Sequence, residues 1–570
     1  TKNKKRENTM KPKSSPKSIK RRDFIKSLSY GSLGLMTFSL LSASEQCRPK
    51  LKRPHILLIL ADDMGYSDIG CFGGEIHTPN LDQLAKNGLR FTHFHNQARC
   101  CPSRASLLTG LYPHQAGFGH MTEDRNLVGY RGDLNRNCVT IAEVLKQAGY
   151  STYMCGKWHL TKYLNPDQPQ LNWPKQRGFD RFYGTITGAC SYFEPTTLTI
   201  DNKRIEPEAE SYYYTGAITD WALKYIREHD YHRPFFLYVA YTAPHWPLHA
   251  FEEDIEKYKG RYDIGWDKLR QERYKRMIEL GIIDPKWKLT TRDSRVPPWE
   301  EAPHKEWQAR RMEVYAAQVE QMDKGVGQII KELEKKGELE NTLIFFLSDN
   351  GGCAEEITES WFNWLLHGQD QVAREFTREG RRVRFGNFPH IFPGPANTYA
   401  SYGIPWANAS NTPFRLYKHW VHQGGIATPL IVHWPARIKT PGELRHQPGH
   451  LIDIMATCVD VAQASYPQSY NGESIQPYEG LSLVPTFDNK PLDREAIYFE
   501  HEGNRAVISG EWKLVARGKD GPWELYNLDE DRTETQDLAP KYPQKVKQLA
   551  QMWYEWARRT HVLPWPWNGT

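Results

Sequence analysis

The chain has 570 residues and nine cysteines, but no two cysteines form a Cys-x-x-Cys pair. A zinc knuckle needs such pairs and a small secreted scaffold needs a dense disulfide framework, so the cysteine pattern argues against both classes. The chain also has no internal repeat. Its length is compatible with one large α/β domain accompanied by a smaller one.

Excess positive charge is absent outside the N-terminal arm. The formal net charge is +6, but residues 1–26 hold 11 Lys or Arg against Glu7 and Asp23, so this segment contributes +9 and the rest of the chain −3. A slightly acidic body gives no reason to expect a nucleic-acid partner.

The N-terminal segment also lacks an apolar run long enough for a permanent membrane anchor. Lys20-Arg-Arg-Asp-Phe-Ile-Lys26 precedes a weakly apolar run from Ser27 to Ala43, which Gly31 and Gly34 interrupt. This order, with small residues at its end, is typical of a twin-arginine signal with its cleavage site. We therefore expect a bacterium to export the protein through the corresponding machinery, to the periplasm, the cell surface or the medium. A disordered basic tail is the alternative.

Long apolar runs are present in the body of the chain. The run from Pro54 to Leu60 is typical of a strand buried on both faces of a parallel sheet. Similar runs alternate with helical patterns, and the expected strands are 89–94, 151–154, 235–240 and 342–347, with helices at 79–87, 140–149 and 310–333. The sequence predicts an α/β fold with a large, mostly parallel central sheet flanked by helices.

The C-terminal part follows another pattern. Hairpin-like strands at 496–500, 505–516 and 523–526 precede an amphipathic helix at 542–559. They predict a smaller α+β subdomain with a short antiparallel sheet. The expected organisation is therefore a signal or basic arm at 1–44, a catalytic α/β domain at 50–435 and a C-terminal subdomain at 436–570.

Two adjacent cysteines stand at the start of an expected helix. Pro102 suits the first helical position, and Gly110 is placed to end the helix. Cys100 and Cys101 would then lie at its N-terminus, where free N–H groups and the helix dipole lower the pKa of a thiol. A pair of inert buried thiols is the alternative.

Polar residues follow the predicted strands at their carboxyl ends. They are Asp62, Asp63, Lys157, His159, His245, Asp349 and Asn350. In an open α/β sheet, ligands bind outside the carboxyl ends of the strands, so these side chains should converge. Carboxylate and amide oxygens select a hard cation, and we expect Ca²⁺, with Mg²⁺ or Mn²⁺ as alternatives. Taken singly, each motif is equally compatible with a turn or a helix cap.

These residues also carry a family resemblance. Cys100-Cys-Pro-Ser-Arg104, followed by Ala105-Ser-Leu-Leu-Thr-Gly110, resembles the type I sulfatase signature. The other family motifs are matched, in family order, by Asp62-Asp63, Gly156-Lys-Trp-His159, Pro244-His245, Asp349-Asn350 and Gly424-Gly-Ile-Ala-Thr-Pro429. The resemblance covers about residues 53–540, lies within the alkaline phosphatase superfamily, and is nearest to arylsulfatase-type bacterial enzymes.

The resemblance implies that Cys100 is not kept as a thiol. In sulfatases the matching cysteine is oxidised by a formylglycine-generating enzyme to an aldehyde, and Pro102 and Arg104 match part of its recognition sequence. Cys101 occupies the variable position. The aldehyde hydrate offers two hydroxyl groups on one carbon: one attacks sulfur, and the other later loses its proton and expels sulfate as the aldehyde re-forms.

The resemblance also implies roles for the remaining residues. Asp62, Asp63, Asp349, Asn350 and the modified Cys100 would bind one divalent metal ion. Lys157 and Lys418 would neutralise the sulfate oxygens, and Arg104 would brace the hydrate and the metal-site carboxylates. His245 would protonate the departing alcohol or phenol, and His159 would take the proton of the second hydroxyl. The expected reaction converts an aryl or carbohydrate sulfate ester to the alcohol or phenol plus inorganic sulfate.

Two other functions remain open from the sequence. Formylglycine-dependent phosphonate monoester hydrolases share the fold and the metal ligands, and a protein whose Cys100 stays a thiol could bind sulfated glycans without cleaving them. Two long polar insertions, 251–309 and 354–411, are interpreted as loops over the cleft that choose the substrate, with surface elaboration as the alternative. Trp361, Trp364 and Trp406 could stack on sugar rings or on an aryl ester. The sequence leaves the natural substrate and the oligomeric state open.

Overall fold

The computed structural model describes residues 52–209 and 211–567. The predicted signal at residues 1–44 lies outside these residues and stays a prediction. Among the described residues, no helix is both long and apolar enough to cross a membrane. Their eight cysteines are all buried and unpaired.

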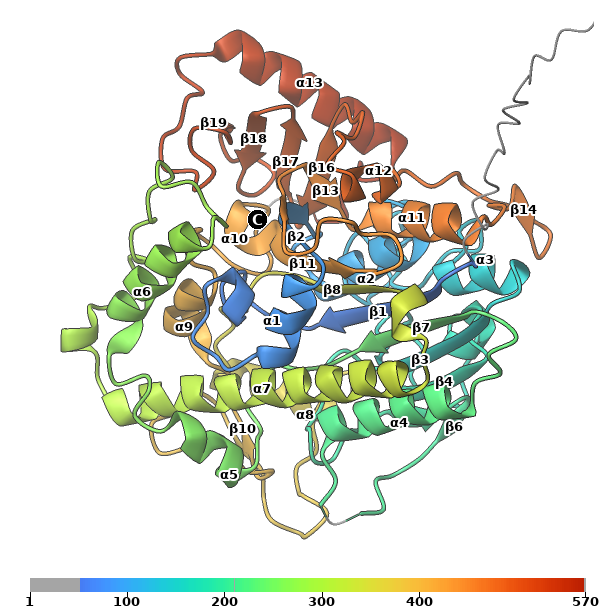
Figure 1. Cartoon of the computed structure of the whole chain (residues 1–570). Helices are drawn as coiled ribbons and strands as arrows, with labels where there is room; N and C mark the ends of the chain where they lie inside the picture. Colours follow the sequence, from blue (N-terminus) through green and yellow to red (C-terminus); the bar gives the residue numbers. More distant parts are fainter. Residues whose placement is uncertain (1–51, 210, 568–570) are drawn as a thin grey trace, which may run out of the picture. The chain divides into compact units, whose positions relative to one another are not determined.

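A mixed sheet of eleven strands forms the centre of the fold (Figure 1). Ten strands follow the order β12-β2-β11-β8-β1-β7-β3-β4-β5-β6, and β13 pairs with β2. In chain order the strands are β1 His55–Ala61, β2 Leu89–His95, β3 Ser151–Lys157, β4 Arg181–Thr185, β5 Leu198–Ile200, β6 Lys203–Arg204, β7 Phe235–Ala240, β8 Thr342–Ser348, β11 Ala427–His433, β12 Leu444–Arg445 and β13 Gly449–His450. The prediction of a large, mostly parallel sheet is confirmed.

Helices cover both faces of this sheet. Leu57 and Ile59 of β1 pack into the core beneath one helical layer, whereas Leu58 and Leu60 face the other, as the two-residue side-chain period of a strand requires. The first layer contains α1 Pro79–Lys86, α4 Tyr214–Glu228 and the long α7 Lys305–Lys335, and the second contains α2 Cys100–Thr109, α3 Ile141–Gln147 and α11 Ile452–Ala462. Thr140 and Glu143 form a capping box at the start of α3, where the sequence predicted a helix.

The topology brings distant segments to one edge of the sheet. β1 pairs in parallel with β7 and β8, and β3 pairs in parallel with β7. β2 is antiparallel to β11, which is antiparallel to β8, so β2 runs in the same direction as β8. The carboxyl ends of five strands therefore lie along the same edge.

A second, four-stranded antiparallel sheet carries the C-terminal part (Figure 1). Its strands are β16 Ile497–His501, β17 Asn504–Ser509, β18 Trp512–Ala516 and β19 Glu524–Asn527, and α13 Pro543–Arg559 covers one face. The opposite face packs against Ala98, Val421 and Ile426. This contact supports the segments that lead to Cys100 and Lys418. The predicted division at residue 436 stays a prediction, and β12 and β13, which follow it, still pair with β2.

The insertions are less irregular than expected. Within 251–309, the structure forms α5 Glu252–Ile255 and the 15-residue α6 Gly265–Glu279, so the loop prediction is wrong for that stretch. The insertion 354–411 contains α8 Phe362–His367, α9 Gly403–Ser410 and a two-stranded sheet of β9 Arg384–Phe385 and β10 Thr398–Tyr399. The remaining short elements are α10 Gln423–Ile426, α12 Val484–Phe487, β14 Ser469–Tyr470 and β15 Glu473–Ser474.

Candidate active site

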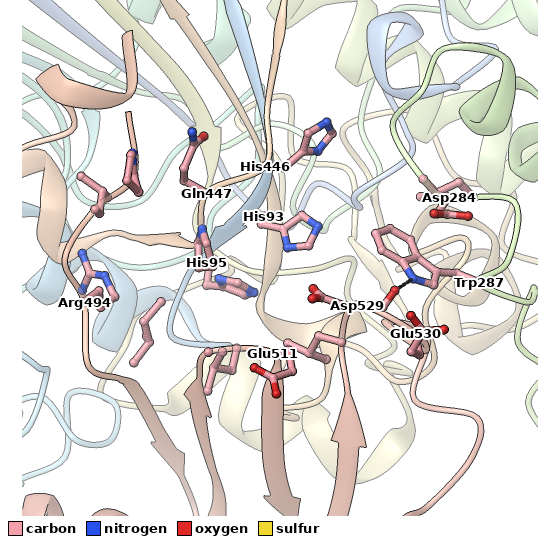
Figure 2. Close-up of a pocket in the computed structure, with 18 of the residues that line it drawn as sticks. His93, His95, Asp284, Trp287, His446, Gln447, Arg494, Glu511, Asp529 and Glu530 are labelled. Carbon is pink, nitrogen blue, oxygen red and sulfur yellow. Dashed lines mark hydrogen bonds between the residues drawn. The ribbon is translucent and has the colours of Figure 1, made fainter. Parts of the chain in front are cut away.

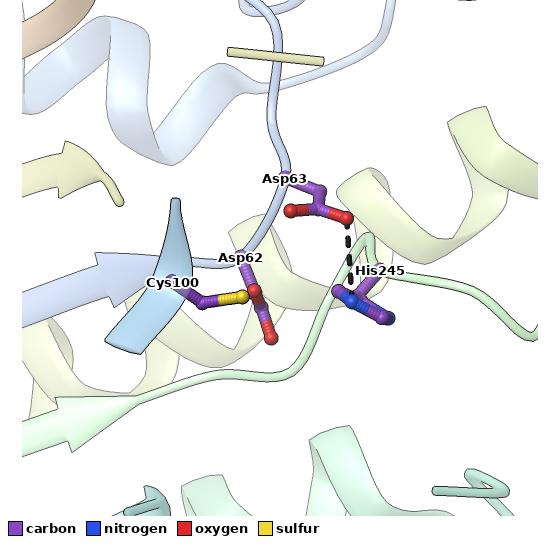
Figure 3. Close-up of side chains that lie close together, drawn as sticks. All are labelled: Asp62, Asp63, Cys100 and His245. Carbon is purple, nitrogen blue, oxygen red and sulfur yellow. Dashed lines mark ion pairs between the residues drawn. The ribbon is translucent and has the colours of Figure 1, made fainter. Parts of the chain in front are cut away.

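The predicted site residues meet at the common strand edge. β1 leads to Asp62 and Asp63, β3 ends in Lys157, β7 leads to His245 and β8 leads to Asp349. Figure 3 shows the thiol of Cys100 pointing toward the carboxylate of Asp62, with Asp63 and His245 beside them. Ligand atoms of these four residues all lie within 4.8 Å of one another. All the site residues named from the sequence are buried here: Asp62, Asp63, Cys100, Arg104, Lys157, His159, His245, Asp349, Asn350 and Lys418.

Cys100 is the first residue of α2, two positions earlier than Pro102 was predicted to start the helix. The backbone N–H of Ser103 donates to the carbonyl of Arg99 at 2.9 Å. This bond closes the first helical turn, which contains Pro102. Pro102 is tolerated there because the early N–H groups of a helix have no intrahelical partner. The Cβ of Cys100 is therefore held by the first turn of a rigid helix.

The helix N-terminus does not decide the pKa of the thiol. Burial raises the pKa of Cys100 above its ordinary value, although Lys157 and Lys418 lower it. The lowered pKa expected from the helix N-terminus is not found at this site, because loss of hydration raises the pKa of the thiol. The unmodified residue is thus a neutral thiol, which is a poor nucleophile.

Asp62 lies between two cations. Lys157 Nζ donates to its Oδ2 at 2.6 Å, and an Arg104 nitrogen lies 3.6 Å from the same oxygen. Burial raises the pKa of Asp62 to about 8 despite Lys157, and the nearby Asp349 adds to the rise. The protein's own cations therefore do not fully compensate the charge of this carboxylate.

The pKa of Asp63 shifts in the opposite direction from that of Asp62. Lys418 Nζ donates to its Oδ2 at 2.9 Å, and His245 Nε2 lies 3.3 Å from that oxygen. Burial on its own would raise the pKa of Asp63, but His245 and Lys418 reverse this and lower it to about 2. Lys418 came only from a short motif match in the sequence, and the structure brings it to the site.

Arg104 holds Asp349 in place. Its Nε and one terminal nitrogen both donate to Asp349 Oδ2, at 3.0 and 2.8 Å, and its other terminal nitrogen donates to the Lys157 carbonyl at 3.1 Å. Asp349 Oδ1 accepts the backbone N–H of Asp63 at 3.2 Å. The guanidinium thereby ties the ends of β3 and β8 to α2.

The oxygen atoms of the cluster fit a divalent cation. Asp62 Oδ1 and Asn350 Oδ1 are buried without a hydrogen-bond partner. Asn350 Nδ2 donates to Asp63 Oδ1 at 2.6 Å, so its carbonyl oxygen is the atom left free. Buried oxygen atoms without partners are costly unless a ligand compensates them. Their chemistry is that of a hard-cation site.

Two histidines border the cluster from different strands. Burial lowers the pKa of His159 well below its ordinary value, with Lys157 and Arg104 adding to the effect, and its Nδ1 has no partner. Its ring packs so closely against Gly188 that a Cβ there would lie 2.0 Å from Cε1. His245 donates its Nδ1–H to the Trp246 carbonyl at 2.6 Å, so its Nε2 faces Asp63 and Lys418.

Sequence reasoning missed one charged pair at the site. Glu355 Oε2 lies 3.6 Å from Lys418 Nζ, and its Oε1 accepts Arg99 at 2.7 Å. Burial would raise the pKa of Glu355, but Lys418 and Arg99 hold it well below its usual range. Its position five residues after Asn350 was the available signal. The carboxylate connects the second insertion to both α2 and the Lys418 loop.

Trp246 packs against the ring of His245, and two further tryptophans contact Trp246. Trp246, Trp361 and Trp364 form edge contacts with ring centroids 5.9–6.4 Å apart, and Trp364 is 37% exposed. Trp406 does not join them. It is fully buried against Trp266 and Trp299, so the prediction that it stacks on substrate is wrong.

A large cavity among the described residues lies elsewhere. It has a volume of about 810 Å³ and is lined by segments around Trp287, His93, His446 and the edge of the C-terminal sheet (Figure 2). None of the predicted site residues lines it. Cavity size alone would therefore point away from the charged cluster.

Comparison with known proteins gives the same family along most of the chain. Residues 54–464 match the family model described as Sulfatase, and residues 414–559 match N-sulphoglucosamine sulphohydrolase, C-terminal. An uncharacterized sulfatase of Schizosaccharomyces pombe is 33% identical, over 90% of this chain and 95% of that protein. The arylsulfatase of Klebsiella aerogenes is 31% identical, over 78% of this chain and 94% of that enzyme.

A solved structure shows the same fold. The crystal structure of Ps i-CgsB in complex with k-i-k-neocarrahexaose aligns with a TM-score of 0.61 and 25% identity, covering 89% of this chain and 93% of that one. Its similarity extends through both the central sheet and the C-terminal sheet, since it spans most of both chains. With its sequence signature, its fold and its strand-end cluster, the chain belongs to the sulfatase family of the alkaline phosphatase superfamily.

Proposed function

We propose that this protein hydrolyses sulfate monoesters with a formylglycine formed from Cys100. The observation that carries the proposal is the position of Cys100 Sγ, within 4.8 Å of ligand atoms of Asp62, Asp63 and His245. Lys157, paired with Asp62, and Lys418, paired with Asp63, flank the same point. A nucleophile at this position is surrounded by the groups that an anionic ester and a metal ion require.

Charge balance supports an anionic substrate bound together with a divalent ion. Four buried or half-buried carboxylates, Asp62, Asp63, Asp349 and Glu355, face four cations, Arg99, Arg104, Lys157 and Lys418. With all four carboxylates ionised, the cluster is therefore close to neutral by itself. A divalent cation makes it positive by two charges, which suits a sulfate ester and the additional negative charge that develops in its transition state.

Asp62, Asp63, Asp349 and Asn350 would hold the ion, for which we propose Ca²⁺. Their all-oxygen donor set and the two unpartnered oxygens support this choice over zinc. When bound, the ion supplies Lewis-acid polarisation of the sulfate and lowers the pKa of the attacking hydroxyl. Arg104 keeps Asp349 oriented, and Lys157 keeps Asp62 oriented, through the contacts described above.

The roles of the histidines follow from their free ring nitrogens. His245 Nε2, with Nδ1 tied to a carbonyl, faces the site and would give a proton to the departing oxygen when the ring is in its imidazolium form, although burial lowers the pKa of His245 to about 3 before substrate binds. His159, with an unpartnered Nδ1, is placed to accept the proton of the second hydroxyl when sulfate is expelled and the aldehyde re-forms. Lys157 and Lys418 would hold the sulfate oxygens during both steps.

For the substrate, we propose an aryl sulfate or a sulfated carbohydrate. The tryptophans beside His245 support this class because aromatic faces stack on phenyl and sugar rings. The Klebsiella aerogenes relative is an arylsulfatase, and Ps i-CgsB binds a neocarrahexaose. We further propose that the protein is exported through a twin-arginine signal and that a formylglycine-generating enzyme acts on Cys100.

The chemical identity of residue 100 tests the proposal. The protein would be produced with and without a co-expressed formylglycine-generating enzyme, and the peptide containing Cys100 analysed by mass spectrometry. We expect the mass of an aldehyde in place of a thiol, with sulfatase activity proportional to the modified fraction. Full activity in a preparation whose Cys100 is entirely thiol would refute the formylglycine mechanism. Stoichiometric zinc without Ca²⁺ in native metal analysis would refute the choice of ion.

A further inference from the structure

A second group of metal-ligating side chains lies beside the candidate active site. It consists of His419, His501 and Glu502, whose ligand atoms lie within 4.8 Å of one another, and we call it the histidine cluster. His419 directly follows Lys418, and its backbone N–H donates to the Ala98 carbonyl at 2.7 Å. The cluster is thus joined by the backbone to both Lys418 and the entrance of α2, although the proposed reaction uses none of its side chains.

The distances within the cluster suit a tetrahedral metal ion. His419 Nδ1 lies 3.0 Å from Glu502 Oε2, and His501 Nε2 lies 3.9 Å from Glu502 Oε1. Zn–N and Zn–O bonds of roughly 2.0–2.2 Å in tetrahedral geometry place neighbouring ligand atoms about 3.3 Å apart. Small side-chain rotations would bring the observed separations to that value.

His501 provides an independent indication that a ligand is missing. Its side chain is completely buried, yet neither Nδ1 nor Nε2 has a hydrogen-bond partner. A buried imidazole without any partner is costly. Its Nε2 lies on the side of Glu502, so an ion between the two residues would satisfy it.

The exposure of the histidine cluster, its neighbouring residues and the local charge also suit a bound metal ion. The side chains of His419 and Glu502 are 31% and 35% exposed, which leaves a path for an ion from solvent. His120 Nε2 lies 2.6 Å from Glu502 Oε1 and stacks on His501, so it can orient the carboxylate as an outer partner. The neighbouring cation Arg99 is paired with Glu355.

We propose that the histidine cluster is a second metal site, specific for Zn²⁺. Two imidazoles and one carboxylate form a donor set that zinc prefers and Ca²⁺ does not. The ion would link the Lys418–His419 segment to the turn between β16 and β17.

The test measures zinc and calcium content together. The full-length protein would be dialysed against excess Ca²⁺, which fills the all-oxygen site, and then equilibrated with increasing Zn²⁺ before elemental analysis. The variants are Glu502→Gln and His419→Gln, both at half-exposed positions, and the matched control is His232→Gln, an exposed histidine outside the cluster.

We expect the wild type and the His232→Gln control to bind one Zn²⁺ per chain without losing Ca²⁺. The two cluster variants should keep their Ca²⁺, which also shows that they are folded, and bind Zn²⁺ at least ~10-fold more weakly. Zinc should raise the melting temperature of the wild type but not that of the cluster variants. Equal zinc binding by all four proteins, or displacement of Ca²⁺ one for one, would overturn the proposal.

Discussion

The strand-end residues around Cys100, which we call the catalytic cluster, lie next to the histidine cluster, but the two differ in their donor atoms and in their burial. The catalytic cluster gathers oxygen ligands at the carboxyl ends of parallel strands, where all its side chains are buried. The histidine cluster takes His419 from a loop, His501 from the last position of β16 and Glu502 from the turn that follows, and two of its three members are partly exposed. Lys418 and His419, adjacent in sequence, belong one to each.

The difference in position suits the two clusters to the different functions that we propose for them. Strand ends are rigid, so they can hold several like charges close together and impose a fixed geometry on a reacting group. Loops tolerate a more exposed site that an ion can enter and leave. The two clusters should therefore differ in their response to substitution, in the metal that they bind and in their effect on turnover.

The largest expected effect is the loss of the nucleophile, which only the catalytic cluster contains. Cys100→Ala should reduce kcat on the order of 10⁴- to 10⁶-fold with an aryl sulfate, because no other group can take its place. Cys101→Ala is the matched control, since it removes a neighbouring buried thiol and should keep most of the activity. Comparable losses in both variants would mean that Cys100 acts only through packing.

The next effect separates the two catalytic histidines. His245→Ala should lower kcat/KM ~10²- to 10⁴-fold for esters of poor leaving groups and much less for nitrophenyl sulfate, because a good leaving group needs no proton. His159→Ala should lower the turnover of both substrates alike, since the role proposed for His159 is in sulfate release. A uniform loss in His245→Ala would argue against its role as the acid.

Metal content separates the clusters directly. Asp349→Asn removes a carboxylate from the catalytic cluster and leaves Arg104 with only the more distant carboxylate of Asp62. We expect Ca²⁺ affinity to fall at least ~10²-fold, measured by elemental analysis after dialysis, while zinc binding at the histidine cluster persists. Parallel loss of both ions would show that the two sites are not independent.

The smallest effect concerns the aromatic edge of the catalytic cluster. Trp364→Ala should raise KM for a sulfated oligosaccharide by ~2- to 10-fold, the value of one stacking contact, and leave nitrophenyl sulfate nearly unaffected. Phe392→Ala, another exposed aromatic of the same insertion, serves as the control. An equal rise in both variants would assign the effect to general loosening of the insertion.

The sequence predicted the catalytic cluster better than anything else in the molecule. Asp62 and Asp349 could be found because each follows an apolar run that fixes a buried strand, and parallel strands bring their ends together. Cys100 could be found because a specific signature surrounds it. Its pKa could not, since burial and the charges of Lys157, Lys418, Asp349 and Asp62, which come from distant parts of the chain, set it together.

The histidine cluster left much weaker signals in the sequence than the catalytic cluster did. His419 and His501 are 82 residues apart and meet only because the C-terminal sheet packs against the loop before α10. No periodicity or spacing encodes that contact. Trp406 shows the converse error: its position in a Trp-rich insertion indicated a surface role, but α9 turns it into the core against Trp266.

The most direct test of the account compares two ester classes on one preparation. Protein with fully modified residue 100 would be assayed for kcat/KM with an aryl sulfate and the matching aryl phosphonate monoester, with Cys100→Ala as the blank. We predict that the sulfate ester is the better substrate and that the blank is inactive on both. A preference for the phosphonate ester would leave the fold and the site intact but contradict the proposed reaction.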